Sequence, residues 1–284
     1  WCGSMVGETV SRSTARQFLR RATVFATILT LGLPGGPSAA STTDLQLAAI
    51  ARDSRTRELL YVESHYIQNV GRVGEQRVVL YRCSLGGPAF ARKELTYGTT
   101  RAVPEFTLFD ARTGYQEGLR RTASGTKVFQ RADARAPQRE ASVPQDAALV
   151  VDAGFDDFVR SHWTELEAGN TVKFSFLVPS RLEALTFKIR KHHDSTFEGT
   201  PVSVIRLALS GVFGWVLPHI DVSYRKSDRA LLRYEGLTNM RDEKGDNHVA
   251  VIEFPNAARR EVPVDLGAVR NEPLIARCPA PRAS

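Results

Sequence analysis

Two adjacent histidines, His192 and His193, stand between Lys191 and Asp194. Two imidazoles and a carboxylate are groups that can ligate a metal ion or act as acid and base. Successive side chains of a β-strand point to opposite faces, so both histidines could coordinate one ion only where the chain bends. The pattern therefore favours a solvated strand end. The alternative is an envelope hydrolase or metal-dependent enzyme that uses His192, His193 and Asp194.

Motifs that are typical of enzyme active sites are missing from the rest of the sequence. The chain has no G-x-S-x-G nucleophile elbow, no H-E-x-x-H or C-x-x-C pattern, no phosphate-binding glycine loop and no EF-hand loop. The other histidines are scattered, and Asp156 with Asp157 is typical of acidic residues near a helix N-terminus. We therefore expect no catalytic residue, no metal and no cofactor, and the sequence favours a non-catalytic protein.

An apolar run from Val212 to Leu217 is unusual for a connection between strands. It follows Gly211, contains Gly214 and ends at Pro218, and glycines permit a segment to move. Apolar side chains that line a curved sheet suit an acyl chain or a hydrophobic peptide. The predicted ligand-binding residues come from this run and from neighbouring predicted strands: Phe213, Trp215, Leu217, Phe174, Phe176 and Leu185. The alternative is that these side chains simply form the core.

Two cysteines, Cys83 and Cys278, follow the first forty residues. An even number of cysteines in an exported chain favours a disulfide. Sequence spacing does not by itself place two Cα atoms within bonding reach, so two unrelated buried thiols are the alternative. A bridge would tie the C-terminal tail back to the first predicted hairpin.

The N-terminal residues have the features of a cleavable export signal. Four arginines in 12–21 precede an uncharged apolar run at 22–33, and small residues follow. The run is shorter than the roughly 20 residues that span a bilayer, so a retained anchor is the weaker interpretation. We expect a signal peptide at 1–40, preceded by an upstream extension at 1–4. The mature domain, 41–284, is then periplasmic and has no membrane span, with outer-membrane association or secretion as alternatives.

Composition and charge fit a folded domain with a modest positive charge. Hydrophobic residues make up 42% and charged residues 24% of the chain, which is close to globular averages. The formal net charge of +7 falls to +4 without residues 1–40. Basic residues alternate with acidic ones along the sequence, so no basic face and no nucleic-acid partner are expected. The expected partners are an apolar small molecule or an envelope protein.

Period-two alternation predicts strands through most of the mature chain. The predicted strands span 58–67, 76–83, 93–97, 105–109, 115–120, 126–131, 171–178, 184–191, 201–209, 220–226, 230–234 and 248–254. Residues 132–146 carry two prolines and several charges, which predicts an exposed loop. Apolar residues at helical spacing between Gly154 and Leu166 predict one amphipathic helix near 153–168. The expected fold is mainly β, as an antiparallel, strongly curved sheet, a half-barrel or a sandwich.

Five segments carry a resemblance to known proteins: 93–97 (KELTY), 104–110 (PEFTLFD), 114–118 (GYQEG), the 155–163 helix with 176–180 (FLVPS), and 231–242 (LLRYEGLTNMRD). Together they resemble a group of uncharacterised, exported, β-rich proteobacterial proteins of unknown function. The chain is also similar, more remotely and in architecture, to lipoprotein carriers of the LolA type. That resemblance implies a half-barrel that holds acyl chains under a lid of helices.

Overall fold

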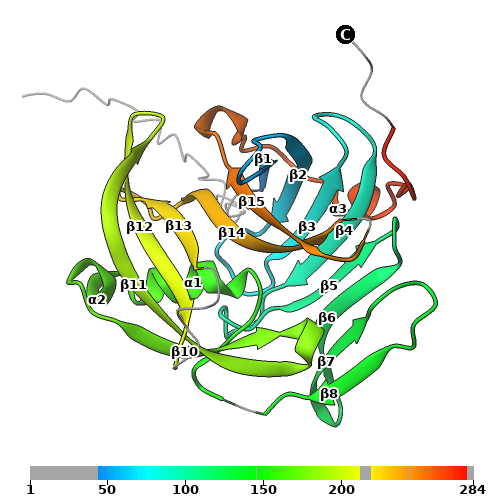
Figure 1. Ribbon diagram of the computed structural model, residues 1–284, viewed down its shortest axis with the longest axis horizontal. Coiled ribbons are helices and arrows are strands. Elements are labelled where there is room, and N and C mark those ends of the chain that lie inside the picture. Colours follow the sequence, from blue (N-terminus) through cyan, green and yellow to red (C-terminus); the bar gives the residue numbers. More distant parts are fainter. Residues whose placement is uncertain (1–43, 145, 212–218, 243, 280–284) are drawn as a thin grey trace, which may run out of the picture. The chain divides into compact units, whose positions relative to one another are not determined.

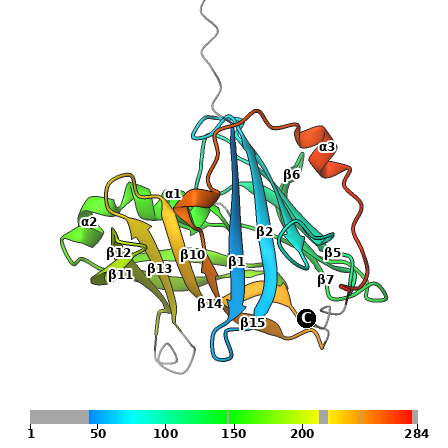
Figure 2. The same ribbon diagram turned by 90° about the horizontal axis from the view of Figure 1, so that it is seen from above.

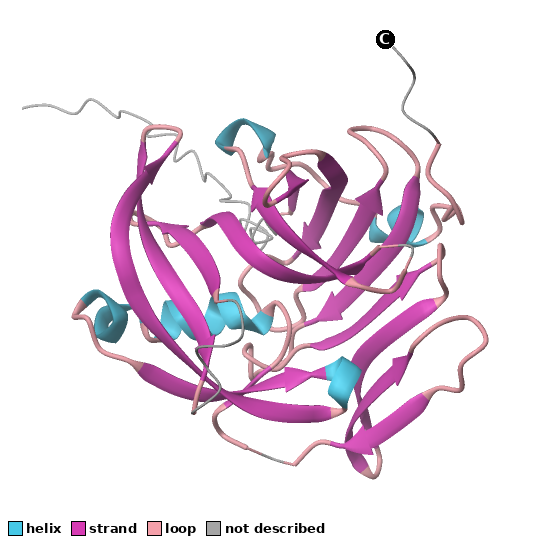
Figure 3. Cartoon of the chain, viewed as in Figure 1, coloured by secondary structure: helices cyan, strands magenta, loops and turns pink. Residues whose placement is uncertain are grey.

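The computed structural model describes residues 44–144, 146–211, 219–242 and 244–279. Strands dominate these residues and helices are few (Figure 3). Fifteen strands form one sheet in the order β8-β7-β6-β5-β4-β3-β2-β1-β15-β14-β13-β12-β11-β10-β9. The sheet is open and curled, so the prediction of a mainly β, strongly curved sheet is confirmed. The predicted signal peptide at 1–40 lies outside the described residues.

The strands have the following bounds: β1 Leu45–Asp53, β2 Leu59–Gln68, β3 Gln76–Arg82, β4 Ala89–Thr96, β5 Glu105–Asp110, β6 Tyr115–Thr122, β7 Gly125–Arg131, β8 Arg139–Ser142, β9 Leu149–Val150, β10 Val172–Val178, β11 Glu183–Phe197, β12 Thr200–Leu209, β13 Ile220–Arg225, β14 Leu231–Arg241 and β15 Asn247–Glu253. The helices are α1 Gly154–Ser161, α2 Trp163–Glu167 and α3 Leu266–Arg270, with short 3₁₀ turns η1 Pro179–Arg181 and η2 Asn256–Ala258.

The structure differs from the sequence predictions at several elements. The single helix near 153–168 is two helices, because the chain leaves helical geometry at His162, which ends α1 and precedes α2. The loop predicted at 132–146 contains β8, which pairs with β7 through backbone bonds that do not depend on side-chain polarity. β1 was missed; its Leu45–Asp53 segment pairs with strands from both ends of the chain, β2 and β15.

Neighbouring strands are antiparallel, with one exception at the end of the sheet. β9 and β10 are parallel, with Ser175 opposite Leu149 and Phe176 opposite Val150. Parallel strands need a long crossover, usually helical, and α1 with α2 supply it. The amphipathic helical segment predicted from the sequence is therefore the connection that turns the chain back along the sheet.

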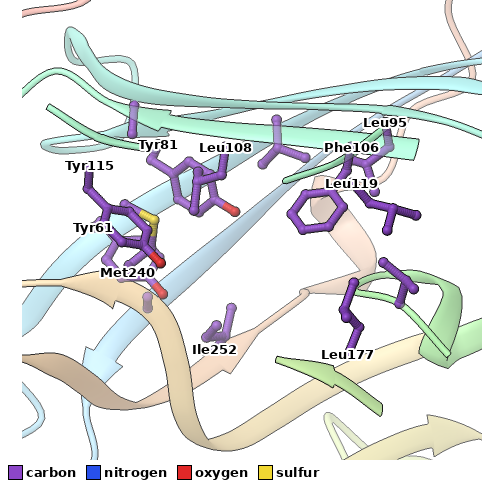
Figure 4. Packing of buried hydrophobic residues seen from close by; sticks show 14 of the residues in the cluster. Tyr61, Tyr81, Leu95, Phe106, Leu108, Tyr115, Leu119, Leu177, Met240 and Ile252 are labelled. Atoms are coloured by element: carbon purple, nitrogen blue, oxygen red, sulfur yellow. The ribbon is translucent and has the colours of Figure 1, made fainter. Parts of the chain in front are cut away.

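The largest hydrophobic cluster lies where strands from the two halves of the sheet face each other. Tyr61, Tyr81, Tyr115 and Met240 are among its buried members (Figure 4). Leu177 of β10 belongs to the same cluster as residues of β5, β6 and β7. The sheet therefore curls far enough for its last strands to pack against its first half.

A second cluster forms where α1 and α2 cover the inward face of β10 to β13 (Figure 1). Phe158 and Trp163 from the helices are buried there together with Tyr224 of β13. The Tyr224 hydroxyl donates to Asp156 at 2.7 Å, which fixes the first turn of α1 against the sheet. The two helices thus fill part of the concave side of the curl.

The C-terminal segment crosses the outer side of β2, β3 and β4. Val264 and Leu266, at the start of α3, cover Val78 and Leu80, which point outward from β3. Figure 2 shows α3 and the chain after it on this outer side. β3 is therefore buried on both faces, in agreement with its continuous apolar run.

A disulfide ends this crossing and confirms the cysteine prediction. Cys83 follows β3, and its Sγ is bonded to that of Cys278, with the two Cα atoms 5.6 Å apart. Glu272 reaches the same region and accepts two hydrogen bonds from Arg82. Within the described ranges, no helix is both long and apolar enough to cross a membrane.

Candidate functional site

Four phenylalanine rings lie together on the concave face of the sheet. Phe174 and Phe176 alternate along β10, Phe187 stands opposite Phe174 on β11, and Phe155 comes from α1. Their ring centroids are 5.8 to 6.4 Å apart, within the range of favourable aromatic contact. We call these four residues the phenylalanine patch.

The patch contains one fully packed ring and three rings that are partly open to solvent. Phe174 is only 2% exposed and packs against Phe158 at a centroid distance of 4.6 Å. Phe155, Phe176 and Phe187 are half-buried. Phe174 is therefore a core residue, whereas its three neighbours present apolar surface on the concave side.

The structure describes half of the ligand-binding residues that were predicted from the sequence. Phe174, Phe176 and Leu185 come together, since Leu185 lies opposite Phe176 across β10 and β11. Phe213, Trp215 and Leu217 lie outside the described residues, so their placement beside the patch stays a prediction.

Charged side chains are also buried on the concave face, next to the hydrophobic clusters. Lys93 points inward from β4 and its Nζ donates to both Asp152 oxygens, at 3.0 and 2.8 Å. Asp152 precedes α1 in the left-handed conformation, with φ of 44°, which aspartate tolerates better than most residues. Burial opposes the charge on Lys93, but the charge and hydrogen bond of Asp152, together with the charges of Glu117 and Glu63, outweigh it, so the pKa of Lys93 is raised.

Glu117 extends this charged group from β6. Its carboxylate accepts a hydrogen bond from the Tyr115 hydroxyl at 2.5 Å and a longer one from the Asn239 amide at 3.4 Å. Burial raises the pKa of Glu117, although the Tyr115 hydrogen bond and the charge of Lys93 act in the opposite direction. We call Lys93, Glu117, Asp152 and Asn239 the interior polar cluster.

The start of α1 links the interior polar cluster to the phenylalanine patch. Asp152 belongs to the first and Phe155, three residues later, to the second. Tyr234 of β14 also packs against both hydrophobic clusters. The concave face therefore offers apolar rings and buried hydrogen-bonding groups side by side, which is the usual chemistry of a small-molecule site.

The interior polar cluster was missed in the sequence, although a signal for it exists. Lys93 stands between Ala91 and Leu95 in the alternating inward row of β4, and both neighbours are buried. Glu117 stands in the same way between Tyr115 and Leu119 on β6. A charged residue in the apolar row of an alternating strand indicates a buried, paired charge, since such residues are almost never buried alone.

His192 and His193 lie inside a strand and not at a solvated strand end, because β11 continues to Phe197. A bulge between Lys191 and His193 makes His192 the extra residue and brings the two exposed rings together, with centroids 4.7 Å apart. A bulge of this kind interrupts the alternation on which the strand-end prediction depended.

Asp194 forms ion pairs with two lysines and not with the histidines. Its carboxylate lies 2.7 Å from the Lys191 ammonium and 2.8 Å from that of Lys226. Hydrogen bonds from these two lysines lower the pKa of Asp194 to about 2. Among the described residues, no group of three or more histidine, cysteine, aspartate or glutamate side chains is placed to hold a metal ion.

Comparison with known proteins identifies no family for the chain. No protein-family model matches it, and no curated protein matches it either. Several solved structures show a distant likeness. A beta-barrel-like protein of a domain of unknown function, DUF1849, from Brucella abortus is 5% identical, with 75% of this chain and 98% of that chain covered and a TM-score of 0.39.

The other two likenesses are weaker. A DUF1329 family protein from Desulfovibrio piger is 10% identical, with 78% and 87% of the two chains covered and a TM-score of 0.29. A putative outer membrane lipoprotein-sorting protein domain from Vibrio parahaemolyticus is 8% identical, with 77% and 85% covered and a TM-score of 0.28. All three TM-scores lie below 0.5, so these likenesses identify neither the family nor the function of the chain.

Proposed function

We propose that this chain is a non-catalytic protein of the cell envelope that binds an apolar ligand, an acyl chain or a similar hydrocarbon, on its concave face. The observation that supports this function is the phenylalanine patch. Three of its rings stay half-buried although Phe174, in the same group, is packed completely. Neighbouring apolar side chains left open to solvent on a monomer's surface are typical of binding sites.

The composition of the patch suits a hydrocarbon ligand better than a polar one. Leu185 lies opposite Phe176 on one side, and Leu209 lies opposite Phe187 on the other. Both leucines are half-buried. Covering such side chains removes apolar surface from water, at about 25 cal/mol per Å². A flexible hydrocarbon can adapt to rings at different tilts without matching hydrogen bonds.

The disulfide supports a location outside the cytoplasm. Bridges of this type form and persist in oxidising compartments such as the bacterial periplasm. Cys83 and Cys278 are far apart in the sequence, and their bond joins the end of the C-terminal segment to the residue that follows β3. An export signal at 1–40 agrees with this location and is part of the proposal. N-terminal sequencing of the protein from an envelope fraction tests it, and a mature N-terminus near Ser41 is expected.

Binding of a fluorescent fatty-acid probe tests the ligand. We expect saturable binding by the wild type and a loss of about tenfold in affinity for a Phe176→Ala/Phe187→Ala variant, because two apolar contacts are removed. The matched control is Leu59→Ala/Leu237→Ala, which removes two side chains that are 43% and 44% exposed outside the patch. Denaturant unfolding of both variants shows whether each is folded. Absence of probe binding by the folded wild type would reject the proposed function.

A further inference from the structure

The outer face of the strands that carry the phenylalanine patch is basic. Lys173 on β10 lies directly opposite Lys188 on β11, and Arg190 on β11 lies directly opposite Arg206 on β12. Lys188 and Arg190 are two residues apart, so both point to the same face. This arrangement contradicts the sequence-based expectation that basic residues do not gather on one face. We call these four residues the basic stripe.

Like charges placed directly across neighbouring strands destabilise a sheet. Arg206 is offset by Asp221, whose carboxylate lies 2.7 Å from the guanidinium. Lys173, Lys188 and Arg190 are exposed, and no salt bridge joins them to another residue in the part of the chain that the structure describes. Three uncompensated positive charges therefore remain side by side on this face.

The charges of the basic stripe also affect the pKa of His192. His192 lies two residues after Arg190, and its pKa is lowered by burial and by the charges of Arg206, His193 and Arg190, while the charge of Asp221 acts in the opposite direction. Ser175, Thr186 and Ala208 stand opposite or beside the basic residues on this face, and Asp221 of β13 stands opposite Arg206. Among these four positions only Asp221, which pairs with Arg206, is acidic, and none is aromatic.

The side chains around the basic stripe favour one class of anionic partner over the others, which are acidic proteins, nucleic acids and anionic membranes. Protein interfaces are anchored by aromatic and apolar side chains and are depleted in lysine. Single-stranded nucleic acid needs aromatic rings on which bases stack, and duplex DNA needs a longer series of phosphate contacts. A membrane surface with anionic headgroups needs only a few long, flexible cationic side chains on an exposed face.

We propose that the basic stripe docks this protein on anionic phospholipid surfaces. Docking there brings β10 and β11 to the lipid, and their opposite face holds Phe174, Phe176 and Phe187. The proposal is independent of the apolar ligand, because it concerns headgroup charge and is measured without any probe in the patch. Each basic residue near such a surface strengthens binding roughly fivefold, and salt weakens the attraction.

Cosedimentation with vesicles tests the proposal. The wild type is expected to bind vesicles of phosphatidylglycerol mixed with phosphatidylcholine, to leave them at high salt, and not to bind phosphatidylcholine alone. The variant Lys173→Gln/Lys188→Gln/Arg190→Gln should bind at least about tenfold more weakly. The matched control, Arg55→Gln/Arg135→Gln/Arg139→Gln, removes the same net charge from exposed positions elsewhere and should bind as the wild type does.

Denaturant unfolding shows whether the stripe variant is still folded, so that weaker vesicle binding is not caused by unfolding. Since the substitutions relieve repulsion between directly opposed charges, the stripe variant should be at least as stable as the wild type. Equal losses in the two triple variants would overturn the proposal in favour of net charge alone. Wild-type binding that ignores headgroup charge, or no binding to anionic vesicles, would overturn it as well. Fatty-acid binding should be unchanged in the stripe variant, which separates this test from that of the proposed function.

Discussion

The Nζ of Lys93, on β4, lies 2.8 Å from Oδ2 of Asp152, the residue that leads into α1. The pair is buried and joins the first half of the sheet to the helical crossover between β9 and β10. Replacing one partner of a buried pair leaves an uncompensated charge. Lys93→Met should therefore lower the free energy of unfolding by about 3 to 5 kcal/mol in urea denaturation.

A second variant shows whether the pairing causes that loss. Lys93→Met/Asp152→Asn removes both charges, and asparagine tolerates the left-handed backbone of position 152. Its cost should be well below the sum of the two single changes, as expected for residues in direct contact. Lys127→Met is the matched control, since Lys127 bonds to the Ser142 hydroxyl at the sheet edge. Additive costs for Lys93 and Asp152 would contradict a coupled pair.

Glu117 should make the protein less stable as pH rises. Its pKa in the folded state is raised above 4.5, chiefly by burial, so folding favours the protonated carboxyl. The stabilisation is complete below the unfolded value and is lost as pH rises through the folded one. Glu117→Gln keeps an oxygen that accepts from Tyr115 and cannot ionise. The variant should gain stability relative to the wild type as pH rises above 4.5 and through the raised pKa of Glu117, and a gap that does not widen with pH would contradict this.

The disulfide should contribute to stability through the long loop that it closes. Cys83 and Cys278 are 195 residues apart, and a bridge over such a loop is worth about 2 to 5 kcal/mol. The Cys83→Ser/Cys278→Ser variant should lose this amount in denaturant unfolding. A reducing agent should destabilise the wild type and leave the variant unchanged. Hydrogen exchange should rise first in 264–278, because the bridge holds that end against the sheet.

Gly118 should not tolerate a side chain. A Cβ at this position would lie 2.2 Å from the Phe106 carbonyl oxygen and 2.5 Å from Cζ of Phe129. Gly118→Ala should therefore destabilise the protein by about 1 to 3 kcal/mol, as overpacking does. Gly98→Ala is the matched control, since the nearest atom to its Cβ would be 3.8 Å away. Equal stability of the two variants in thermal unfolding would show that β5 and β7 can move apart.

Most strands could be predicted because alternation is a local property of the sequence. β2, β3, β5 and β7 begin and end within a residue or two of their predicted bounds. β11 was predicted too short, because its second half is polar and exposed and so resembles a strand end. The aromatic half of the site, Phe174 and Phe176, was found for the same local reason: both alternate along one strand.

Local sequence patterns predict the mainly β class, the strands with their inward and outward rows, and the helical segment after residue 153. Each of these depends on residues a few positions apart. Which rows of side chains contact one another depends on the tertiary packing. Strand register sets Lys173 opposite Lys188, the curl of the sheet brings Leu177 to the first half, and the chain reversal at α1 pairs Lys93 with Asp152. The same long-range packing brought Cys83 within bonding reach of Cys278. These contacts join residues that are distant in the chain, and their partners follow from the summed packing of the whole sheet and from no local pattern.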